Sequence, residues 1–472
     1  MENNSPSIVE RPIIKSLFTL AIPIVLANLL QGAYQLIDAF RVGRLGGDAV
    51  ASVSISFPIM FLLISMGTGF AVAGSTLIAQ YFGAKKKAMV NHVAAQTLLM
   101  VLIVSLFLSV LGLVFSPMLL HLMGVEPAIF ANALAFLRIS FFGLLFVFGY
   151  SMFQSIMRGI GEVKMPMYIV LGTVVLNAIL DPFFIYGFGP LPSMGVSGAA
   201  MATLFTQGIA AVIGISILFK GKYNIRVQWS DFIPDFGYIK KAFLLGLPSS
   251  LEMSSRGLGM VILTFLITSF GTQAVASYGA GSNILQLIII PAMGLSMAVS
   301  ILVGQNIGAK RMDRAAKTAK IGSLISFGLL TAIGIIVFFC ASFLIKFFIP
   351  HDLAIVAGGT EFLRTVALTF GFMGLQMAIL GVFRASGNMT TAFMLSVISQ
   401  WVFQFPLAYI LSKHTGLGIH GLRYTFPLTN IFTAIMCYFR FMRGTWKKTI
   451  ITKEDKVIER ISEETFVEEG TR

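Results

Sequence analysis

The sequence predicts an all-α integral membrane protein, with twelve transmembrane helices in two pseudo-symmetric six-helix bundles. Three observations support this fold class: an apolar composition, a recurrence of long apolar spans, and an internal repeat. Hydrophobic residues make up 56% of the 472 residues, charged residues only 11%, and the mean hydropathy is +0.87. A soluble domain has roughly a quarter of its residues charged. Much of the protein surface must therefore face lipid rather than water.

Apolar spans of about 20 residues, the length that crosses a hydrocarbon core of about 30 Å, recur along the whole chain. Because lipid offers no hydrogen-bond partners, the backbone of each span must be helical. The first span lacks a small-residue cleavage site, so we expect it to be retained as the first transmembrane helix. The twelve predicted helices cover residues 15–40, 51–80, 92–117, 129–153, 165–187, 196–219, 240–268, 275–304, 319–347, 361–383, 391–412 and 419–442.

The loops between these spans alternate between rich and poor in Lys and Arg. Rich loops include residues 85–87, 220–241 and 310–320, whereas residues 188–195 and 269–273 contain neither residue type. The positive-inside rule places the rich loops in the cytoplasm. We therefore expect a multi-pass protein of the cell membrane with both termini in the cytoplasm. The same placement of charge argues against a nucleic-acid partner, despite a net charge of +14.

An internal repeat relates the two halves of the chain. A shift of 225 positions superposes residues 18–86 on residues 243–311 without a gap. Chance matches of Leu and Ile are common in apolar sequences, but aligned Pro, Gly, Gln and Lys at one offset are not. The matched pairs include Pro23 with Pro248, Gly69 with Gly294, Gln80 with Gln305 and Lys85 with Lys310.

The repeat divides the chain into two lobes. We expect an N-lobe of six helices over residues 1–220, a cytoplasmic linker over 221–239, a C-lobe over 240–448 and an acidic cytoplasmic tail over 449–472. Equivalent helices in parallel repeats have the same orientation in the membrane, as in several transporter folds. A cavity between two such bundles, opened alternately to each side by rocking, is the mechanical hypothesis.

Two carboxylates at membrane depth are the candidate functional residues of the N-lobe. Helical spacing places Gln31, Tyr34 and Asp38 on one face of the first helix, and Asn177 and Asp181 on one face of the fifth. A charged side chain inside the bilayer is costly and marks an ion or proton pathway. Two acids in a low-dielectric cavity repel when both are ionised, which favours proton uptake. With amide and hydroxyl oxygens nearby, the same cluster could instead bind Na⁺.

The repeat strengthens this hypothesis. Asp38 aligns with Leu263, and Asp181 aligns with Leu407 at an offset of 226. Because Leu occupies both mirror positions, the fold does not itself require an acid at either place.

The C-terminal half has its own ionisable pair, Glu252 and Arg256, four residues apart on the seventh helix. The simpler interpretation is a self-neutralising helical pair. The alternative is a pair of polar cavity residues that contact substrate or gate the movement of the bundles. Pro23 and Pro248 each permit a bend in the first helix of their half. A bend at Pro23 would couple protonation of Asp38 to cavity shape.

No Walker A sequence, metal-ligand spacing or Ser/His/Asp arrangement occurs in the sequence. Neither an ATP-driven pump nor an enzyme is therefore supported, and we expect no cofactor beyond a coupling ion, H⁺ or Na⁺. Cys340 and Cys437 lie inside apolar spans and suggest neither a disulfide nor a metal cluster.

The sequence resembles the multidrug and toxic compound extrusion (MATE) family, and its DinF-like branch in particular. The resemblance covers the whole chain. Each motif alone is weakly specific, but together the motifs occur in the same order and at the same spacing as in the family. These motifs are Ala21-Ile22-Pro23, Tyr34 through Asp38 to Gly46, Gln80-Tyr81-Phe82-Gly83, Arg158-x-x-Gly161, Asn177-x-x-x-Asp181-Pro182, Gly195-x-x-Gly198 through Thr203, and Arg384-x-x-Gly387.

The resemblance implies export of substrates against an inward cation gradient. It assigns the cation site to the positions of Asp38, Asn177, Asp181 and Thr203, of which Thr203 rests on the resemblance alone. It also implies that Gln31 and Tyr34 line the substrate cavity, where we place Gln154 as well, and that Pro23 is the helix-1 kink. The cavity network departs from the family pattern at Phe136, where relatives often carry Tyr. A cation site in the C-lobe is not expected, because residues 366–383 contain no acid.

The functional hypothesis is a cation-coupled antiporter, with H⁺ favoured over Na⁺, that exports amphipathic and often cationic small molecules as a monomer in the lipid bilayer. The alternative is a lipid- or saccharide-flipping transporter of the same superfamily. A scaffold or receptor without transport is a third class, and the membrane-embedded acids argue against it.

Overall fold

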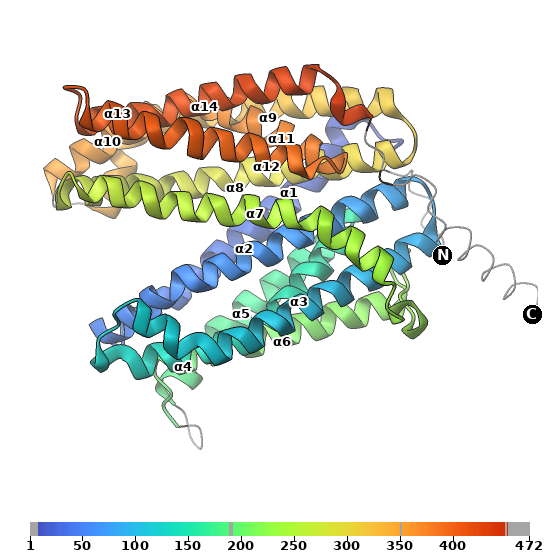
Figure 1. Ribbon diagram of the computed structural model, residues 1–472, viewed down its shortest axis with the longest axis horizontal. Helices are drawn as coiled ribbons and strands as arrows, with labels where there is room; N and C mark the ends of the chain where they lie inside the picture. Colours follow the sequence, from blue (N-terminus) through green and yellow to red (C-terminus); the bar gives the residue numbers. More distant parts are fainter. Residues whose placement is uncertain (1–7, 188–191, 350–351, 449–450, 452–472) are drawn as a thin grey trace, which may run out of the picture. The chain divides into compact units, whose positions relative to one another are not determined.

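The computed structural model describes residues 8–187, 192–349, 352–448 and 451. These residues form helices joined by short loops, with no strand among them (Figure 1). The helices of the first half are α1 (Ile13–Gly43), α2 (Gly47–Gly83), α3 (Lys87–Leu122), α4 (Pro127–Gly159), α5 (Lys164–Tyr186), α6 (Val196–Lys220) and the short η1 (Trp229–Phe232). Those of the second half are α7 (Phe236–Thr268), α8 (Thr272–Gly308), α9 (Met312–Phe348), α10 (Leu353–Ala367), α11 (Phe370–Ala385), α12 (Met389–Val397), η2 (Ile398–Gln404), α13 (Phe405–Lys413), α14 (Ile419–Met442) and η3 (Thr445–Lys447).

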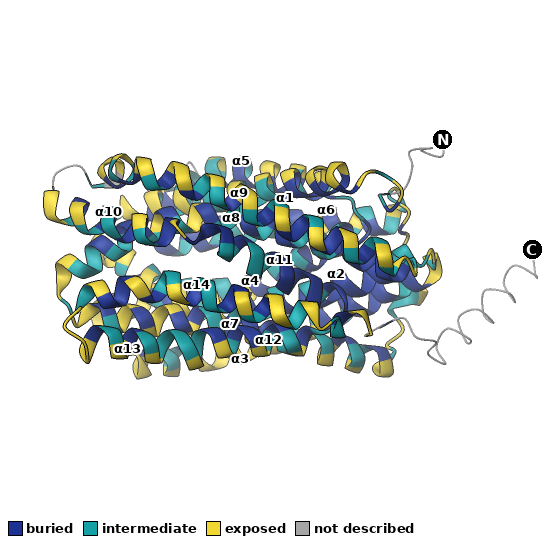
Figure 2. Ribbon diagram, turned by 90° about the horizontal axis from the view of Figure 1, so that it is seen from above, coloured by how far each residue is buried: buried dark blue, intermediate teal, exposed yellow. Residues whose placement is uncertain are grey.

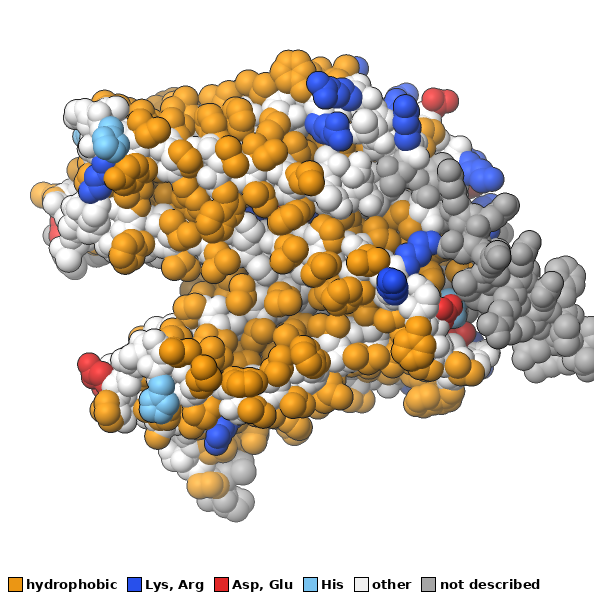
Figure 3. Space-filling model, in the orientation of Figure 1, with side chains coloured by type: hydrophobic (Ala, Val, Ile, Leu, Met, Phe, Trp, Pro, Cys, Tyr) orange, Lys and Arg blue, Asp and Glu red, His pale blue; other side chains and the backbone are white. Residues whose placement is uncertain are grey.

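These helices confirm the predicted membrane fold class. Ten helices of the described chain are long and apolar enough to cross a membrane. The helices α10 and α11, which meet at 53°, reach that length and apolar content only when they are counted together, where one helix over residues 361–383 was expected. The remaining expected span, residues 419–442, is α14, a 24-residue helix of lower apolar content. Hydrophobic side chains cover much of the visible flanks of the helices, and most visible Lys and Arg side chains lie toward helix ends (Figure 3).

The repeat is visible in the geometry of the loops as well as in the sequence. The helices α2 and α8 each contain 37 residues. Each is preceded by a glycine with positive φ, 108° at Gly46 and 91° at Gly271. Each is followed by a lysine in the left-handed region, with φ of 58° at both Lys85 and Lys310. Such backbone angles are uncommon outside glycine, so their recurrence at matched positions reflects a shared turn.

The helices group into two compact units whose boundaries fall inside α1 and α7. Unit 1 comprises residues 1–25 and 251–450, and unit 2 comprises residues 26–250 and 451–472. The first part of α1 therefore belongs to the unit that contains α8–α14, and the first part of α7 to the unit that contains α2–α6. The predicted lobes follow the sequence repeat and so place their boundaries elsewhere, at residues 220 and 240. Most of the predicted acidic tail lies outside the described residues.

Glycines at matched positions of the repeat allow close contact with the parts of α1 and α7 that belong to the unit formed mainly by the other half of the sequence. In unit 2, a Cβ on Gly69 of α2 would lie 2.2 Å from the backbone nitrogen of Ser250. In unit 1, a Cβ on its repeat partner Gly294 of α8 would lie 2.4 Å from Cγ2 of Val25. Both distances are too short for any side chain, so these positions permit close helix contact. Exposed residues lie mainly along the outward helix faces, and buried residues lie mainly between helices (Figure 2).

The segment before α7 is held on α3 by a buried glutamine. Gln96 is fully buried, and its Nε2 donates to the carbonyl oxygens of Asp231 (2.7 Å) and Ile233 (2.8 Å). Its Oε1 accepts from the backbone N–H of Asp235 at 3.0 Å. The Asp235 carboxylate in turn accepts from the N–H of Tyr238 in the first turn of α7. The predicted linker is thus an ordered part of unit 2 that fixes where α7 begins.

Candidate functional site

The residues predicted on α5 are paired by their helical spacing. Asn177 and Asp181 are both buried, with exposures of 1% and 0%. The Asn177 Nδ2 donates to Oδ1 of Asp181 at 3.2 Å. Pro182 follows within the same helix. The amide therefore binds Oδ1 of Asp181 and leaves Oδ2 for partners on neighbouring helices.

An arginine of α1 reaches the same carboxylate. Arg41 Nη2 donates to the carbonyl oxygen of Ala178 at 2.9 Å, and its Nε lies 3.9 Å from Oδ2 of Asp181. Asp38, one turn earlier on α1, is half-buried and interacts electrostatically with Asp181. The site thus contains two acids and one arginine, and the arginine offsets the charge of only one of them.

Tyr34 connects α1 to α6. Its hydroxyl donates to Oγ1 of Thr203 at 2.9 Å and lies 3.3 Å from Oγ1 of Thr206. Thr206 is fully buried and donates to the carbonyl oxygen of Ala202. Thr203 is thereby linked to Tyr34, which lies one turn before Asp38 on α1. Sequence reasoning did not identify Thr206, although its place three residues after Thr203 on one helix could have suggested it.

Three buried oxygens of this cluster have no hydrogen-bond partner within the described chain: Asp38 Oδ1, Asn177 Oδ1 and Asp181 Oδ2. A buried acceptor without a partner is costly, so the cluster favours a proton or a cation. All three atoms are hard oxygen ligands, which suit Na⁺ as well as H⁺. No group of three or more His, Cys, Asp or Glu residues that could hold a metal occurs in the described part of the chain.

The other predicted cavity residues, Gln31 and Gln154, make no hydrogen bond with this cluster in the described chain. Gln31 of α1 is exposed. Gln154 of α4 is half-buried and hydrogen-bonded to the side chain of Tyr150, whose hydroxyl donates to the carbonyl oxygen of Pro166. Pro23 lies inside α1 just before the residues at which the helix passes from unit 1 to unit 2. That position suits a point of bending.

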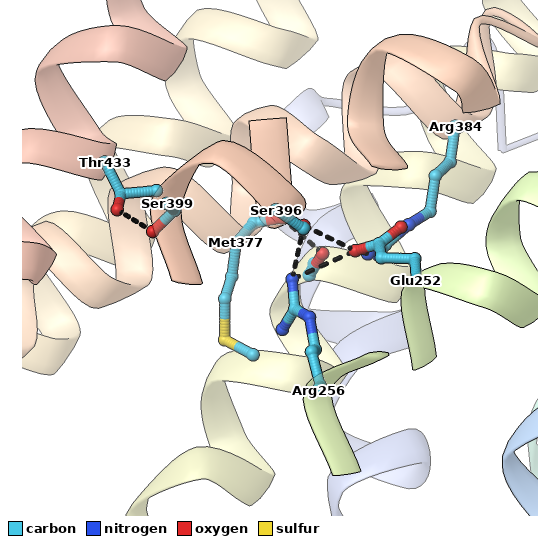
Figure 4. Close-up of polar contacts among 8 residues, drawn as sticks. Glu252, Arg256, Met377, Arg384, Ser396, Ser399 and Thr433 are labelled. Carbon is cyan, nitrogen blue, oxygen red and sulfur yellow. Dashed lines mark hydrogen bonds and ion pairs between the residues drawn. The ribbon is translucent and has the colours of Figure 1, made fainter. Parts of the chain in front are cut away.

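The pair Glu252 and Arg256 is part of a larger charge cluster, so the interpretation as an isolated helical pair is incomplete. Glu252 is fully buried, and its Oε1 accepts from Arg256 Nη2 at 3.0 Å and from Arg384 Nη2 of α11 at 2.5 Å. Ser396 Oγ of α12 donates to the same oxygen at 3.0 Å and accepts from Arg256 Nη2 at 3.2 Å (Figure 4). Sequence reasoning missed Arg384 and Ser396 in this role, because both lie on helices distant in the sequence.

Comparisons with known proteins identify relatives along nearly the whole chain. The sequence model of the family described as MatE matches residues 23–183 and 248–410, one match in each half, which confirms the internal repeat. The probable multidrug resistance protein YpnP of Bacillus subtilis is 30% identical over 92% of this chain and 96% of its own length. The probable multidrug resistance protein YoeA of the same organism is 28% identical over 93% of this chain and 95% of its own length.

Solved structures show the same fold. A crystal structure of MATE in complex with MaL6 superposes with a TM-score of 0.87 and 26% identity, covering 94% of this chain and 99% of that one. An outward-facing multidrug resistance MATE family transporter of the MOP superfamily superposes with a TM-score of 0.86 and 25% identity, covering 94% and 98% of the two chains. These comparisons support the predicted family but not the DinF-like branch, which stays a prediction.

Proposed function

Because the chain belongs to the MatE family of membrane transporters, we propose that it is a cation-coupled multidrug antiporter that exports amphipathic, often cationic, compounds by alternating access. The coupling ion is H⁺, with Na⁺ as the alternative. The relatives named as multidrug resistance proteins support the substrate class. The cation would bind at Asp38, Asn177, Asp181 and Thr203.

One observation carries the coupling site. Asp38, Asn177 and Asp181 each present a buried oxygen without a hydrogen-bond partner in the described chain. The mirror positions of the two acids, Leu263 and Leu407, offer no such oxygen. Bringing a proton or cation to this cluster would satisfy acceptors that the protein leaves unpaired, and the resulting change in charge can bias the conformation of α1 around Pro23.

The test is substrate efflux from proteoliposomes in which a pH gradient and a Na⁺ gradient are imposed separately. We expect the pH gradient to drive export by the wild-type protein, and Asp38→Asn and Asp181→Asn each to abolish gradient-driven efflux. Leu263→Asn, a substitution at the mirror position of Asp38, is the matched control and should retain coupled export. Full efflux by both Asp variants would refute the site. Efflux that only the Na⁺ gradient drives would identify Na⁺, and not H⁺, as the coupling ion.

A further inference from the structure

A cavity of about 210 Å³ lies inside unit 1, next to the Glu252 charge cluster. Its lining includes Ser399, Gln400 and Gln404 of η2, a π-helix near the middle of the span that α12 and α13 form with it. π-Helical turns are rare and occur frequently at functional sites. Here the π-helix packs on α7, where Gly259 leaves room for the Gln400 side chain: a Cβ at Gly259 would overlap Gln400 Nε2.

The lining of this cavity combines amides, hydroxyls and methionines with a single charged residue, Arg256, among the described residues that form it. Thr429 is only 7% exposed, and its Oγ1 has no hydrogen-bond partner in the described chain. Its hydroxyl is therefore available to donate to a guest. The full lining is Arg256, Ile289, Met373, Gln376, Met377, Leu380, Ser396, Ser399, Gln400, Gln404, Phe426, Thr429, Asn430 and Thr433.

Arg256 is only partly neutralised by Glu252. Within the described chain, the hydrogen bonds of the Arg256 side chain all start from Nη2, which leaves Nη1 and Nε for another acceptor. Its side chain is 36% exposed, while that of Glu252 is fully buried. Glu252 also pairs with Arg384, so one negative charge faces two positive charges. Figure 4 shows the Arg256 guanidinium with one nitrogen toward Ser396 and Glu252 and the rest of the group turned away from them.

We propose that this cavity binds the carboxylate end of an amphipathic organic anion or zwitterion, with Arg256 as its charge partner. A carboxylate of the guest accepts a charge-assisted hydrogen bond from Nη1 of Arg256 and neutralises the surplus positive charge. Met373 and Met377 provide an adaptable apolar wall for the adjoining part of the molecule. The cavity is smaller than most drug-sized pockets, about 300–1,000 Å³, so it holds one end of a larger substrate.

The inference goes beyond the proposed coupling function, because it adds a substrate-recognition site in unit 1 with its own charge preference. Binding at this site can be measured without any ion gradient. A binding experiment can therefore refute this proposal without refuting cation coupling, and the efflux experiment can refute cation coupling without refuting this proposal.

The experiment is equilibrium dialysis of three matched probes against the full chain in phosphatidylcholine nanodiscs, with empty nanodiscs as the blank. The probes are 4-tert-butylbenzoate, the neutral 4-tert-butylbenzamide and the cationic 4-tert-butylbenzyltrimethylammonium. We expect the benzoate to bind the wild-type protein at least about tenfold more tightly than the benzamide, because only the carboxylate pairs with Arg256. Equal binding of the benzoate and benzamide would overturn the proposal whatever the variants do. The ammonium probe is the control for the acids of unit 2, and its binding should be unchanged in Arg256→Gln.

Two variants locate the preference. Arg256→Gln should remove the tenfold difference between benzoate and benzamide, whereas Arg256→Lys, which keeps the charge, should retain a smaller preference. Arg364→Gln, which removes an arginine of α10 outside this cavity, is the matched control and should bind like the wild type. A full benzoate preference in correctly folded Arg256→Gln protein would assign the anion site to other residues and refute the role of Arg256. If Arg256→Gln does not fold, Gln404→Leu, which leaves the charge cluster intact, should still weaken benzoate binding.

Discussion

At the scale of single residues, the tyrosine one turn before Asp38 connects two helices of the candidate coupling site. Tyr34 donates to Thr203 of α6, so it fixes the position of α1 where Asp38 begins the next turn. Hydrogen bonds between transmembrane helices contribute about 0.6 kcal/mol on average. The contribution of this bond to stability should therefore be small, and its main effect should be on the geometry of the coupling site.

We predict that Tyr34→Phe lowers gradient-driven efflux while reducing the free energy of unfolding by only about 0.6 kcal/mol. The physical reason is that the phenyl ring keeps its packing but loses the bond that orients α1 against α6. Efflux rates and denaturant unfolding of the purified protein measure the two quantities. Thr203→Ser should keep the bond and most of the efflux, whereas Thr203→Val should behave like Tyr34→Phe. Wild-type efflux in both Tyr34→Phe and Thr203→Val would contradict this role.

The same scale shows which site residues the sequence could identify. Asp38, Asn177 and Asp181 were recognisable because carboxylates and paired amides are rare in apolar spans. Thr206 was not, since hydroxyls occur throughout apolar helices and usually bond to the preceding turn. Arg384 could be aligned with Arg158 but not placed beside Glu252, because the two residues are 132 positions apart and no local signal in the sequence indicates their contact.

At the scale of elements, Gln96 on α3 determines where the loop before α7 lies. Its amide makes three hydrogen bonds to the backbone of residues 231–235 from a fully buried position. A leucine there would leave two carbonyl oxygens and one N–H without these partners. These hydrogen bonds are part-buried, so the loss of each one costs about 0.5–1.5 kcal/mol.

We therefore predict that Gln96→Leu accelerates hydrogen exchange at the backbone amides of residues 226–238 and lowers the thermal midpoint in detergent. Hydrogen exchange followed by mass spectrometry checks the first effect, and a thermal scan checks the second. The matched control is Asn91→Ala, which removes one exposed hydrogen bond, from the Arg226 N–H to Asn91 Oδ1, and should have a smaller effect. Unchanged exchange over residues 226–238 in Gln96→Leu would show that the loop is held by other contacts.

The sequence predicted most elements but not their irregularities. Apolar length predicts twelve helical spans because lipid forces each one to be helical. The described chain has ten spans of that kind, or eleven with the bent pair of α10 and α11. The 53° bend between α10 and α11 escaped prediction, since no proline occurs at Leu368 or Thr369, where the helix breaks. The π-helix at residues 398–404 escaped for a related reason: its extra residue per turn depends on packing against α7, which is distant in the sequence.

At the scale of the whole molecule, duplication explains the common scaffold, and the proposed coupling site depends on the differences between the two halves. The repeat predicts two similar helix sets, yet packing assigns the first part of α1 and of α7 to the opposite unit. A sequence repeat cannot reveal this exchange, because it aligns helices and carries no information on which neighbours they contact. Both helices change unit just after a repeated proline, Pro23 or Pro248. The duplicated proline therefore belongs to the scaffold. The α1 copy shares its helix with Asp38, whereas the α7 copy shares its helix with Glu252, whose charge is already paired with two arginines.

The placement of basic loops predicts the orientation of the molecule in the membrane, and two exposed residues between transmembrane helices can test it. Ser230, in the Lys- and Arg-rich region before α7, should face the cytoplasm, and Thr415, between α13 and α14, should face the other side. Cys340 and Cys437 are first replaced by Ser, and a single cysteine is then introduced as Ser230→Cys or Thr415→Cys. A membrane-impermeant maleimide should label Thr415→Cys in intact cells and Ser230→Cys only after permeabilisation. Labelling of Ser230→Cys in intact cells would reverse the predicted orientation, and with it the direction in which an inward cation gradient could drive export.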